Sequence, residues 1–308
     1  MALMALVLAR GLAAPGTIFE RTVLAGDNSP SSDSARAKAL QAAIEKLKPL
    51  HTKLGPPGPD DWLAHHPEPG QTFLEYTRSN PTLPRGKRHV IYVQPIGDFT
   101  DTQRKIITLT ADFMGRYFSL PVKIQDNLPL SLIPAQARRR HPTWGVDQVL
   151  TSYVRENVLT PHLPADAAAC IAFTTSDLWP GPGWNFVFGE ASTSERVGVW
   201  SIYRNGDPAE SPDSFRLCLL RTMQTAVHET GHMFSLPHCI AYQCGMCGSN
   251  SREGGQARRK GAPCCWPLGA QGSARAPGGL RLTSAPSLCA PSAWRRSVTP
   301  PAPPRSPA

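Results

Sequence analysis

The sequence has no long run of apolar residues. An apolar stretch at the start is interrupted by Arg10 after about nine residues, whereas a membrane-spanning helix needs roughly 18 or more. No basic segment precedes this stretch, so it matches a secretory signal or transit peptide only weakly. We therefore expect no membrane span, and secretion stays open as the less favoured alternative.

Acidic residues are almost absent from residues 251–308. This segment has nine Lys and Arg but one acid, Glu253, and its net charge of +8 accounts for nearly all of the +9 of the whole chain. It has no hydrophobic period, is rich in Pro, Gly and Ala, and ends in PPAPPRSPA, a composition typical of disorder. Because it also lacks regularly interleaved aromatic residues, we expect no specific nucleic-acid partner, although tethering to acidic partners stays a weaker alternative. The abrupt change after Asn250 also fits an alternative reading of the C-terminal coding region.

A chain of 308 residues can hold one large domain or two small ones. We predict three segments: a loosely ordered N-terminal segment over residues 1–35, a catalytic domain over 36–250, and the disordered basic tail over 251–308. The central segment is long enough to bury a sizeable core.

Strand and helix patterns alternate along the central segment, which predicts an α/β (α+β) fold with a mixed sheet. The expected helices cover residues 34–50, 101–118 and 148–158, with a further one beginning near Asp213 or Ser214. The expected strands cover 89–96, 122–124, 168–175, 186–188 and 197–203. The basic run from Arg138 to His141 is interpreted as a solvated turn.

Residues 228–246 read HETGHMFSLPHCIAYQCGM and contain three histidines at the spacing of a zinc peptidase site. His228 and His232 are four residues apart, so on a helix both imidazoles leave the same face and can bind one ion. Pro237 disfavours helical geometry at the preceding residue, so the chain should leave the helix and return to supply His238. Three protein ligands leave a fourth position open, as in a catalytic rather than a structural zinc site.

Glu229 directly follows the first of these histidines, where it can take a proton from a zinc-bound water whose pKa the metal lowers to about 7. The predicted reaction is hydrolysis of a peptide bond. A bare HExxH pattern also arises by chance on helices, but the added His238 and the downstream Met246 favour the metal site. By contrast, the adjacent His65 and His66 point to different sides of the backbone and are not expected to share a metal.

The run HExxHxxxxxHCxxxxCxM resembles the archaemetzincins, a branch of the metzincin metallopeptidases. Sequences similar to those of this family also occur at residues 89–97, 168–180 and 184–204, so the resemblance covers roughly residues 60–250. It implies a metzincin-like domain with zinc bound by His228, His232 and His238, Glu229 as general base, and Met246 in the turn beneath the site. It also suggests that the strand over 197–201 is the edge strand that pairs with an extended substrate, although an ordinary sheet strand is nearly as good an interpretation.

Two features depart from the family pattern. Metzincins have glycine where this chain has Ser235, and a left-handed backbone there would cost a non-glycine residue about 1 kcal/mol. The resemblance also implies a second, structural zinc bound by Cys239, Cys244 and a later CxxC pair. Here Cys264 stands at the first position of that pair, but the second position is Pro267.

The fourth ligand of this second zinc site is therefore open. Cys265 is adjacent to Cys264, and adjacent cysteines rarely serve one tetrahedral ion without strain. Cys247 and Cys289 are the other candidates, and the alternative is that these thiols stay unpaired or partly metallated. Thiols beside a metal motif are typical of a reducing compartment, which favours an intracellular protein in the cytoplasm or nucleus.

The sequence thus predicts a zinc metallopeptidase that acts on a peptide or protein substrate. The motif leaves open whether the protein is an aminopeptidase, because specificity depends on the shape of the pocket. The alternative function is that of a catalytically impaired protein of the same fold, which binds zinc and acts through binding only. In this alternative, Ser235 and a C-terminal tail that departs from the family pattern would make the geometry of the zinc site less well defined.

Overall fold

The computed structural model describes residues 30–59 and 61–250. The helices are α1 (Pro30–Leu47), α2 (Trp62–His65), α3 (Phe73–Arg78), α4 (Asp101–Phe118), α5 (Thr151–Tyr153, continued by a π-helical turn over Val154–Leu159) and α6 (Pro212–Met233). The strands are β1 (Val90–Ile96), β2 (Val122–Ile124), β3 (Arg138–Arg140), β4 (Asp147–Leu150), β5 (Ala167–Thr174), β6 (Asp177–Trp179), β7 (Gly189–Ala191) and β8 (Val197–Ser201). Short 3-10 helices cover Lys48–Leu50, Leu130–Leu132, Ala135–Ala137, Thr160–His162 and Tyr203–Asn205.

Two sheets organise the domain, and the predicted mixed α/β architecture is confirmed. The larger sheet has the strand order β2-β1-β5-β8-β7, in which β7 runs antiparallel to β8 and the other pairs are parallel. The smaller sheet has the order β3-β4-β6. A parallel strand that is covered on both faces should be a continuous apolar run. The central strand β5, with the sequence AAACIAFT, is buried at every position.

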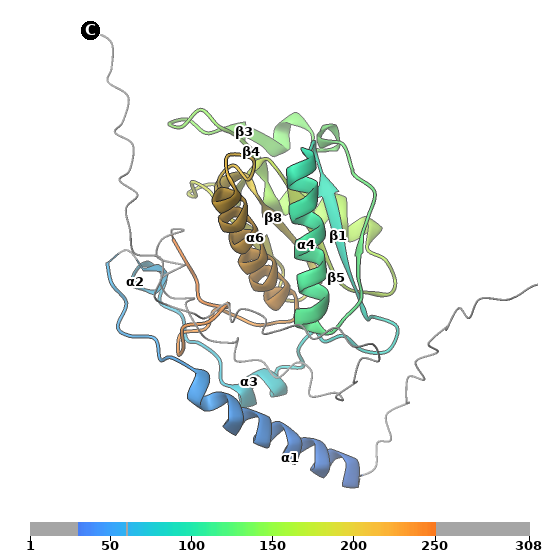
Figure 1. Cartoon of the computed structure of the whole chain (residues 1–308), viewed down its shortest axis with the longest axis vertical. Coiled ribbons are helices and arrows are strands. Elements are labelled where there is room, and N and C mark those ends of the chain that lie inside the picture. The colour runs from blue at the N-terminus through green and yellow to red at the C-terminus, as the bar shows by residue number, and fades with distance from the viewer. Residues whose placement is uncertain (1–29, 60, 251–308) are drawn as a thin grey trace, which may run out of the picture.

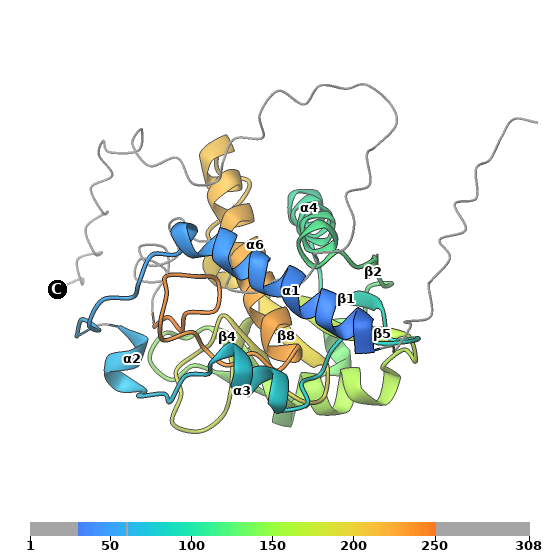
Figure 2. The ribbon, with the colours of Figure 1, turned by 90° about the horizontal axis from the view of Figure 1, so that it is seen from below.

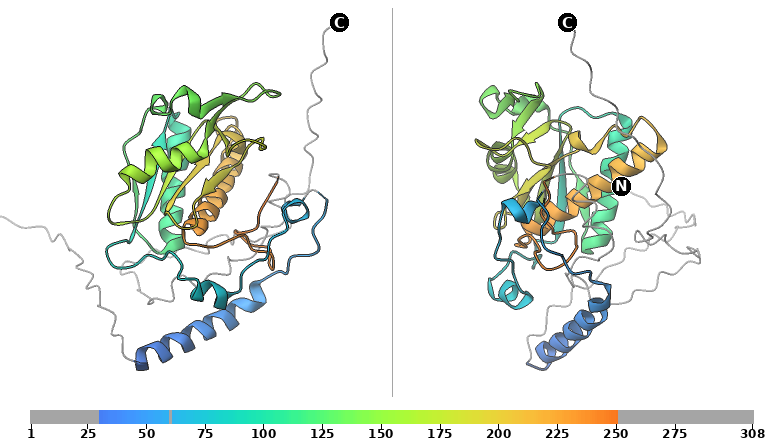
Figure 3. Two further views of the ribbon diagram at one scale, coloured as in Figure 1. Left: turned by 180° about the vertical axis from the view of Figure 1, so that it is seen from behind. Right: turned by 90° about the vertical axis from the view of Figure 1, so that its left-hand side faces the viewer.

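Helical segments cover both faces of the larger sheet. On one face, α4 and α6 lie side by side (Figure 1), and Ile171 and Phe173 of β5 belong to the apolar cluster beneath them. On the other face, the π-helical turn after α5 packs against Cys170 and Ala172 of the same strand. This turn crosses the sheet in the view from behind (Figure 3). Alternate side chains of β5 therefore anchor the layers on its two sides.

Local sequence signals fix the ends of the two long helices. Thr100 and Gln103 form a capping box at the start of α4, which has the bounds predicted from its periodicity. At the start of α6, the Ser211 side chain accepts a hydrogen bond from the backbone N–H of Ser214, and Pro212 occupies the first helical position. The helix therefore begins slightly before the predicted Asp213, and it carries the histidine motif in its last turns.

The region over residues 138–150 differs from the sequence-based expectation. Residues 148–150 were expected to be helical but lie in β4, because Gln148 and its neighbours pair with strands on both sides. The Gln148 side chain is buried and donates to Asp177 at 2.7 Å. The predicted solvated turn is also wrong: residues 138–140 form β3, and His141 is buried with its ring stacked on Trp144 at 3.9 Å. These pairings form between distant segments and override the local pattern.

The strand predicted over 197–201 is present, but its predicted position at the edge of the sheet is wrong. β8, which covers 197–201, pairs with β5 on one side and β7 on the other, and all five of its residues are buried. The edge strand on this side of the sheet is β7, and β2 forms the opposite edge; β7 begins at Gly189, just after the strand expected over 186–188. The family resemblance had suggested β8 for this role, and a strand as short as β7 gives little hydrophobic signal of its own.

An N-terminal strap, comprising residues 51–59 and 61–70, runs along the loop that follows α6. The Leu54 N–H donates to the Ala241 carbonyl at 2.9 Å, and the Gln243 N–H donates to the Thr52 carbonyl at 2.8 Å. The preceding α1 lies below the layered core in Figure 1 and passes in front of it in the view from below (Figure 2). It begins at Pro30, before the predicted domain boundary, while the rest of the predicted N-terminal segment and the tail over 251–308 lie outside the described residues. Within the described ranges, no helix combines the length and apolar character needed to cross a membrane.

Candidate metal centre

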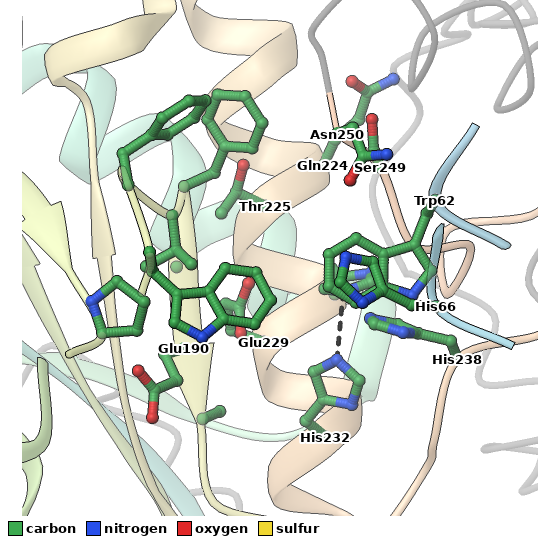
Figure 4. Close-up of a pocket in the computed structure, with 18 of the residues that line it drawn as sticks. Trp62, His66, Glu190, Gln224, Thr225, Glu229, His232, His238, Ser249 and Asn250 are labelled. Carbon is green, nitrogen blue, oxygen red and sulfur yellow. Dashed lines mark hydrogen bonds between the residues drawn. The ribbon is translucent and has the colours of Figure 1, made fainter. Parts of the chain in front are cut away.

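Helix α6 positions two of the three motif histidines. His228 and His232 stand one turn apart, with ring centroids 4.6 Å apart and Nε2 atoms 3.0 Å apart. The helix ends at Met233, and the chain returns with His238, whose ring centroid lies 5.2 Å and 5.0 Å from those of the first two (Figure 4). Within residues 30–59 and 61–250, these three are the one group of His, Cys, Asp or Glu with ligand atoms close enough to share an ion, all within 4.8 Å of one another.

Each of the three imidazoles is held at its Nδ1 atom by an oxygen acceptor. The pairs are His228 with the Gly245 carbonyl (2.8 Å), His232 with the Leu236 carbonyl (2.6 Å) and His238 with the Glu68 carboxylate (2.7 Å). Because all three partners are acceptors, each Nδ1 carries the proton and each Nε2 keeps its lone pair. This is the tautomer that a metal ligand needs.

The charge state of the site also suits a metal ion. Burial, together with the nearby His238, lowers the pKa of His232 to about 4, so this imidazole is neutral at neutral pH. With both Nδ1 atoms protonated, the 3.0 Å contact between the Nε2 atoms of His228 and His232 brings two lone pairs together. A shared cation removes that repulsion, and zinc–nitrogen distances of about 2.0–2.1 Å suit two nitrogens this close. The three histidines therefore fit zinc.

Glu229 lies between the metal-binding helix and the edge strand. Its side chain is buried and lines the same pocket as the histidines. A methyl group added at Gly189 of β7 would lie 2.6 Å from its Oε1 atom, so a glycine is needed at this point of close approach. The carboxylate is thus held in the pocket that the histidines line, by the packing of α6 against β7.

Ser235 occupies the turn that ends α6. Its φ angle is +65°, so the backbone is left-handed at the position where metzincins have glycine. The Ser235 hydroxyl donates to the Thr193 carbonyl at 2.7 Å and accepts from the Thr82 N–H at 2.9 Å. These two bonds connect the turn to two distant segments and offset the cost of a non-glycine residue there.

Met246 lies against α6 on the loop that follows it. It is buried, and a methyl group added at Gly231 would lie 2.4 Å from its Sδ atom. The Cys239 N–H donates to the Met246 carbonyl at 2.8 Å, which closes the loop just after His238. The Met246 turn and the third histidine are therefore parts of one folded loop.

The predicted second zinc site is only partly within the described residues. Cys239, Cys244 and Cys247 belong to a small apolar cluster with Leu54 and Leu236. Within the part of the chain that the structure describes, cysteines do not form a group of three potential ligands. Cys264, Cys265 and Cys289 lie outside the described residues, so the second zinc site stays a prediction. Cys218, in contrast, is completely buried in the main core.

A pocket of about 810 Å³ opens beside the three histidines. One wall is aromatic, because Trp62 and His66 of the strap contact each other at 4.0 Å between centroids and His66 stacks on Trp184 at 5.5 Å. Figure 4 shows Trp62 and His66 on the same side as His238, with Glu190 on the opposite side. The pocket can thus enclose a substrate segment next to the metal ligands.

Sequence reasoning missed the contribution of the strap to this site. Among the described residues, His65 and His66 lie outside the histidine cluster, but His66 lines the pocket. Trp62 also lines it, and Glu68 contacts His238 across 170 positions of sequence. No local pattern in the strap indicates these roles, since they depend on how the strap folds onto the loop after α6.

No model of a protein family matches the chain. Curated relatives do match. Archaemetzincin-2 of Homo sapiens is 30% identical over 244 residues, covering 68% of this chain and 67% of the relative. Archaemetzincin-2 of Rattus norvegicus is 28% identical over 252 residues, covering 72% and 70%. The archaemetzincin of Thermococcus kodakarensis is 33% identical over 168 residues, covering 53% and 84%.

Solved structures of archaeal proteins are also similar. The archaemetzincin of Methanopyrus kandleri is 25% identical, with a TM-score of 0.45, and the match covers 59% of this chain and 92% of that chain. The archaemetzincin of Archaeoglobus fulgidus, solved with malonate, is 25% identical with a TM-score of 0.44, covering 55% and 92%.

Proposed function

The chain belongs to the archaemetzincin family of zinc metallopeptidases, and on this premise we propose that it hydrolyses peptide bonds with Glu229 as the general base. The observation that carries the proposal is the convergence of three imidazoles, each with its Nδ1 atom bonded to an acceptor, on a pocket that also contains this carboxylate. His228, His232 and His238 are the proposed zinc ligands.

In this mechanism the protein binds the ion, orients the peptide and moves a proton. When bound, zinc supplies a Lewis acid and makes water a nucleophile at neutral pH. Glu229 takes the proton of the attacking water and returns it to the departing amine, a role that suits a buried carboxylate next to the first ligand. Gly189 preserves the space in which that carboxylate lies.

The proposed substrate-pairing strand is β7 rather than β8. β7 is one of the two edge strands of the larger sheet, and its residues Gly189, Glu190 and Ala191 all line the pocket. An extended peptide can add to such an edge through backbone hydrogen bonds, with alternate side chains selecting the sequence. This arrangement would align the peptide beside Glu229.

The pocket supports binding along the peptide rather than at its amino terminus. An aminopeptidase needs a carboxylate that binds the substrate ammonium group. Among the described residues, Glu190 is the acid that lines the pocket besides Glu229, and its carboxylate already accepts from Arg155 at 2.7 Å and from the Thr151 hydroxyl. We therefore favour peptides with blocked ends as substrates. The thiols near the motif support an intracellular location, which is part of the proposal.

The test combines zinc content and hydrolysis in the wild type, Glu229→Gln and the control Glu45→Gln, which alters an exposed residue of α1. We expect about one zinc at the histidine site in all three, and hydrolysis of blocked, internally quenched peptides that falls by about 100-fold or more in Glu229→Gln alone. Zinc binding without turnover by the wild type would support the binding-only alternative. Equal activity in Glu229→Gln would refute the role of the base.

A further inference from the structure

The three proposed zinc ligands are not supported in the same way. His228 and His232 lie on α6, where the backbone is fixed by helical hydrogen bonds. His238 follows Pro237 in a stretch without regular secondary structure. The acceptors at His228 and His232 are backbone carbonyls within 17 positions of sequence, but the acceptor at His238 is a carboxylate, 170 positions away. The least constrained ligand therefore has the only charged acceptor of the three.

Glu68 is built into a small network around His238. Its Oε1 atom accepts from the His238 Nδ1 atom at 2.7 Å and from the Trp62 indole N–H at 2.5 Å. The side chains of His238 and Glu68 are 18% and 22% exposed. The Trp62 ring also meets the His238 ring edge-on, with centroids 5.2 Å apart. The imidazole is thus fixed by both a charged acceptor and an aromatic contact.

We propose that Glu68 is a positioning residue for His238, and that the strap is consequently a part of the metal centre. The carboxylate selects the tautomer with the proton on Nδ1 and turns Nε2 toward the other two imidazoles. A carboxylate behind a histidine ligand also makes its free nitrogen a stronger electron donor to a cation. The inference rests on the proposed zinc site, but it does not depend on peptide hydrolysis.

The backbone around Glu68 is suited to this task. Glu68 lies between Pro67 and Pro69, which fix their own φ angles and restrict the residues before them to extended geometry. Gly70 follows with φ +71°, where a methyl group would lie 2.6 Å from Ile240. The carboxylate is therefore presented from a stiff segment that packs on the loop bearing His238, and little conformational freedom is lost when the contact forms.

Further contacts keep the strap and the loop together. Besides the backbone bonds from Leu54 and Gln243, Trp62 packs so closely on Gly248 that a methyl group there would lie 2.4 Å from its ring. Trp62 also contacts His66, which stacks on Trp184 across the pocket. The residue that donates to Glu68 therefore belongs to the aromatic wall, so the wall and the third ligand share one support.

The experiment compares the full chain with Glu68→Gln and Glu68→Ala. Gln keeps an oxygen acceptor but removes the charge, whereas Ala removes the acceptor. Zinc affinity is measured by competition with a chelator, and we expect a loss of about 10- to 100-fold for Ala and a smaller loss for Gln. The matched control Glu45→Gln removes an exposed carboxylate from α1 and should leave zinc affinity within twofold.

A second measurement requires neither bound zinc nor enzymatic activity. In the metal-free wild type, nitrogen NMR of His238 should report the proton on Nδ1, and Glu68→Ala should give a mixture of tautomers. His228 and His232, whose acceptors are unchanged, should keep theirs. If Glu68→Ala fails to fold, as judged by circular dichroism, the Gln variant decides the question.

Several results would overturn the proposal. Glu68 is not a positioning residue if the folded variants bind zinc as tightly as the wild type and His238 keeps its tautomer. An equal loss of affinity in Glu45→Gln would assign the effect to net charge rather than to this contact. A wild type that binds zinc but cleaves no peptide would count against the proposed function and leave this inference standing.

Discussion

The metal centre has a helix-borne half and a loop-borne half, and they are stabilised by different means. The helix-borne half comprises His228, Glu229 and His232 on α6. The loop-borne half comprises His238 and Met246 in the segment after the helix. In the first half, helical geometry alone sets the spacing of the side chains. In the second, the positions depend on contacts with segments more than 150 positions away.

The turn between the two halves is also held by hydrogen bonds to segments distant in sequence. The Tyr76 hydroxyl donates to the Phe234 carbonyl at 2.8 Å, and Ser235 bonds to Thr82 and Thr193. A regular element satisfies its own backbone groups, whereas an irregular one needs partners from elsewhere. The comparison therefore predicts that the two halves respond differently to the same kind of substitution.

The largest effect should come from Gly189→Ala, which disturbs the helix-borne half without changing a ligand. The new methyl group would lie 2.6 Å from the Glu229 carboxylate and displace it. We expect zinc content to be unchanged and kcat to fall by about 100-fold. The control is Gly55→Ala, where nothing lies within 4 Å of the new methyl group. Unchanged kcat in Gly189→Ala would show that the carboxylate has room to move.

Lowering the pH should destabilise the metal-free protein through His232 of the helix-borne half. The pKa of His232 is lowered to about 4 by burial, below its ordinary value of 6.5, so protons bind the unfolded chain more tightly. The free energy of unfolding should therefore decrease as the pH falls from about 6.5 to about 4, by up to about 3 kcal/mol from this group. Urea unfolding with a chelator present measures the effect.

A His232→Asn variant provides the comparison for this titration. Since it lacks the buried imidazole, its stability should depend less on pH over the same interval. Parallel pH curves for the variant and the wild type would show that His232 is not the group responsible.

Gly231→Ala tests the junction between the halves. The added methyl group would lie 2.4 Å from the Met246 Sδ atom, so the loop must shift away from α6. We expect a loss of about 2 kcal/mol in the free energy of unfolding, as for other overpacked sites. Gly245→Ala is the matched control in the same loop, because its methyl group would meet its nearest neighbour, Val227, at 4.0 Å. Similar losses in both variants would contradict the close approach at Gly231.

The smallest effect is a difference between two substitutions of Ser235. Ser235→Ala and Ser235→Gly both lose the bonds to Thr82 and Thr193, but glycine also relieves the left-handed backbone. The Gly variant should therefore be more stable than the Ala variant by about 1 kcal/mol in urea unfolding. Equal stabilities would mean that the left-handed backbone carries no cost at this position.

Long periodic segments of the fold were predictable from the sequence. The helix over 101–118 was placed with the bounds that the structure has, because its pattern is long and local. The short strand over 122–124 was also placed with the observed bounds. Residues 148–150 were assigned to a helix because the sequence gives no sign that β3 and β6 pair with them. The same lack of information on pairing led to β8, rather than β7, being taken as the edge strand.

The sequence by itself determined the metal motif, because four-residue spacing on a helix forces two imidazoles onto one face whatever surrounds them. It also indicated the return of the chain at Pro237 and marked Ser235 as the position where a left-handed backbone would have a cost. Only the tertiary structure decided which strand borders the pocket, and it alone brought Glu68 and Trp62 to His238. The physical reason is that those contacts join segments far apart in sequence, and their geometry depends on how the layers pack.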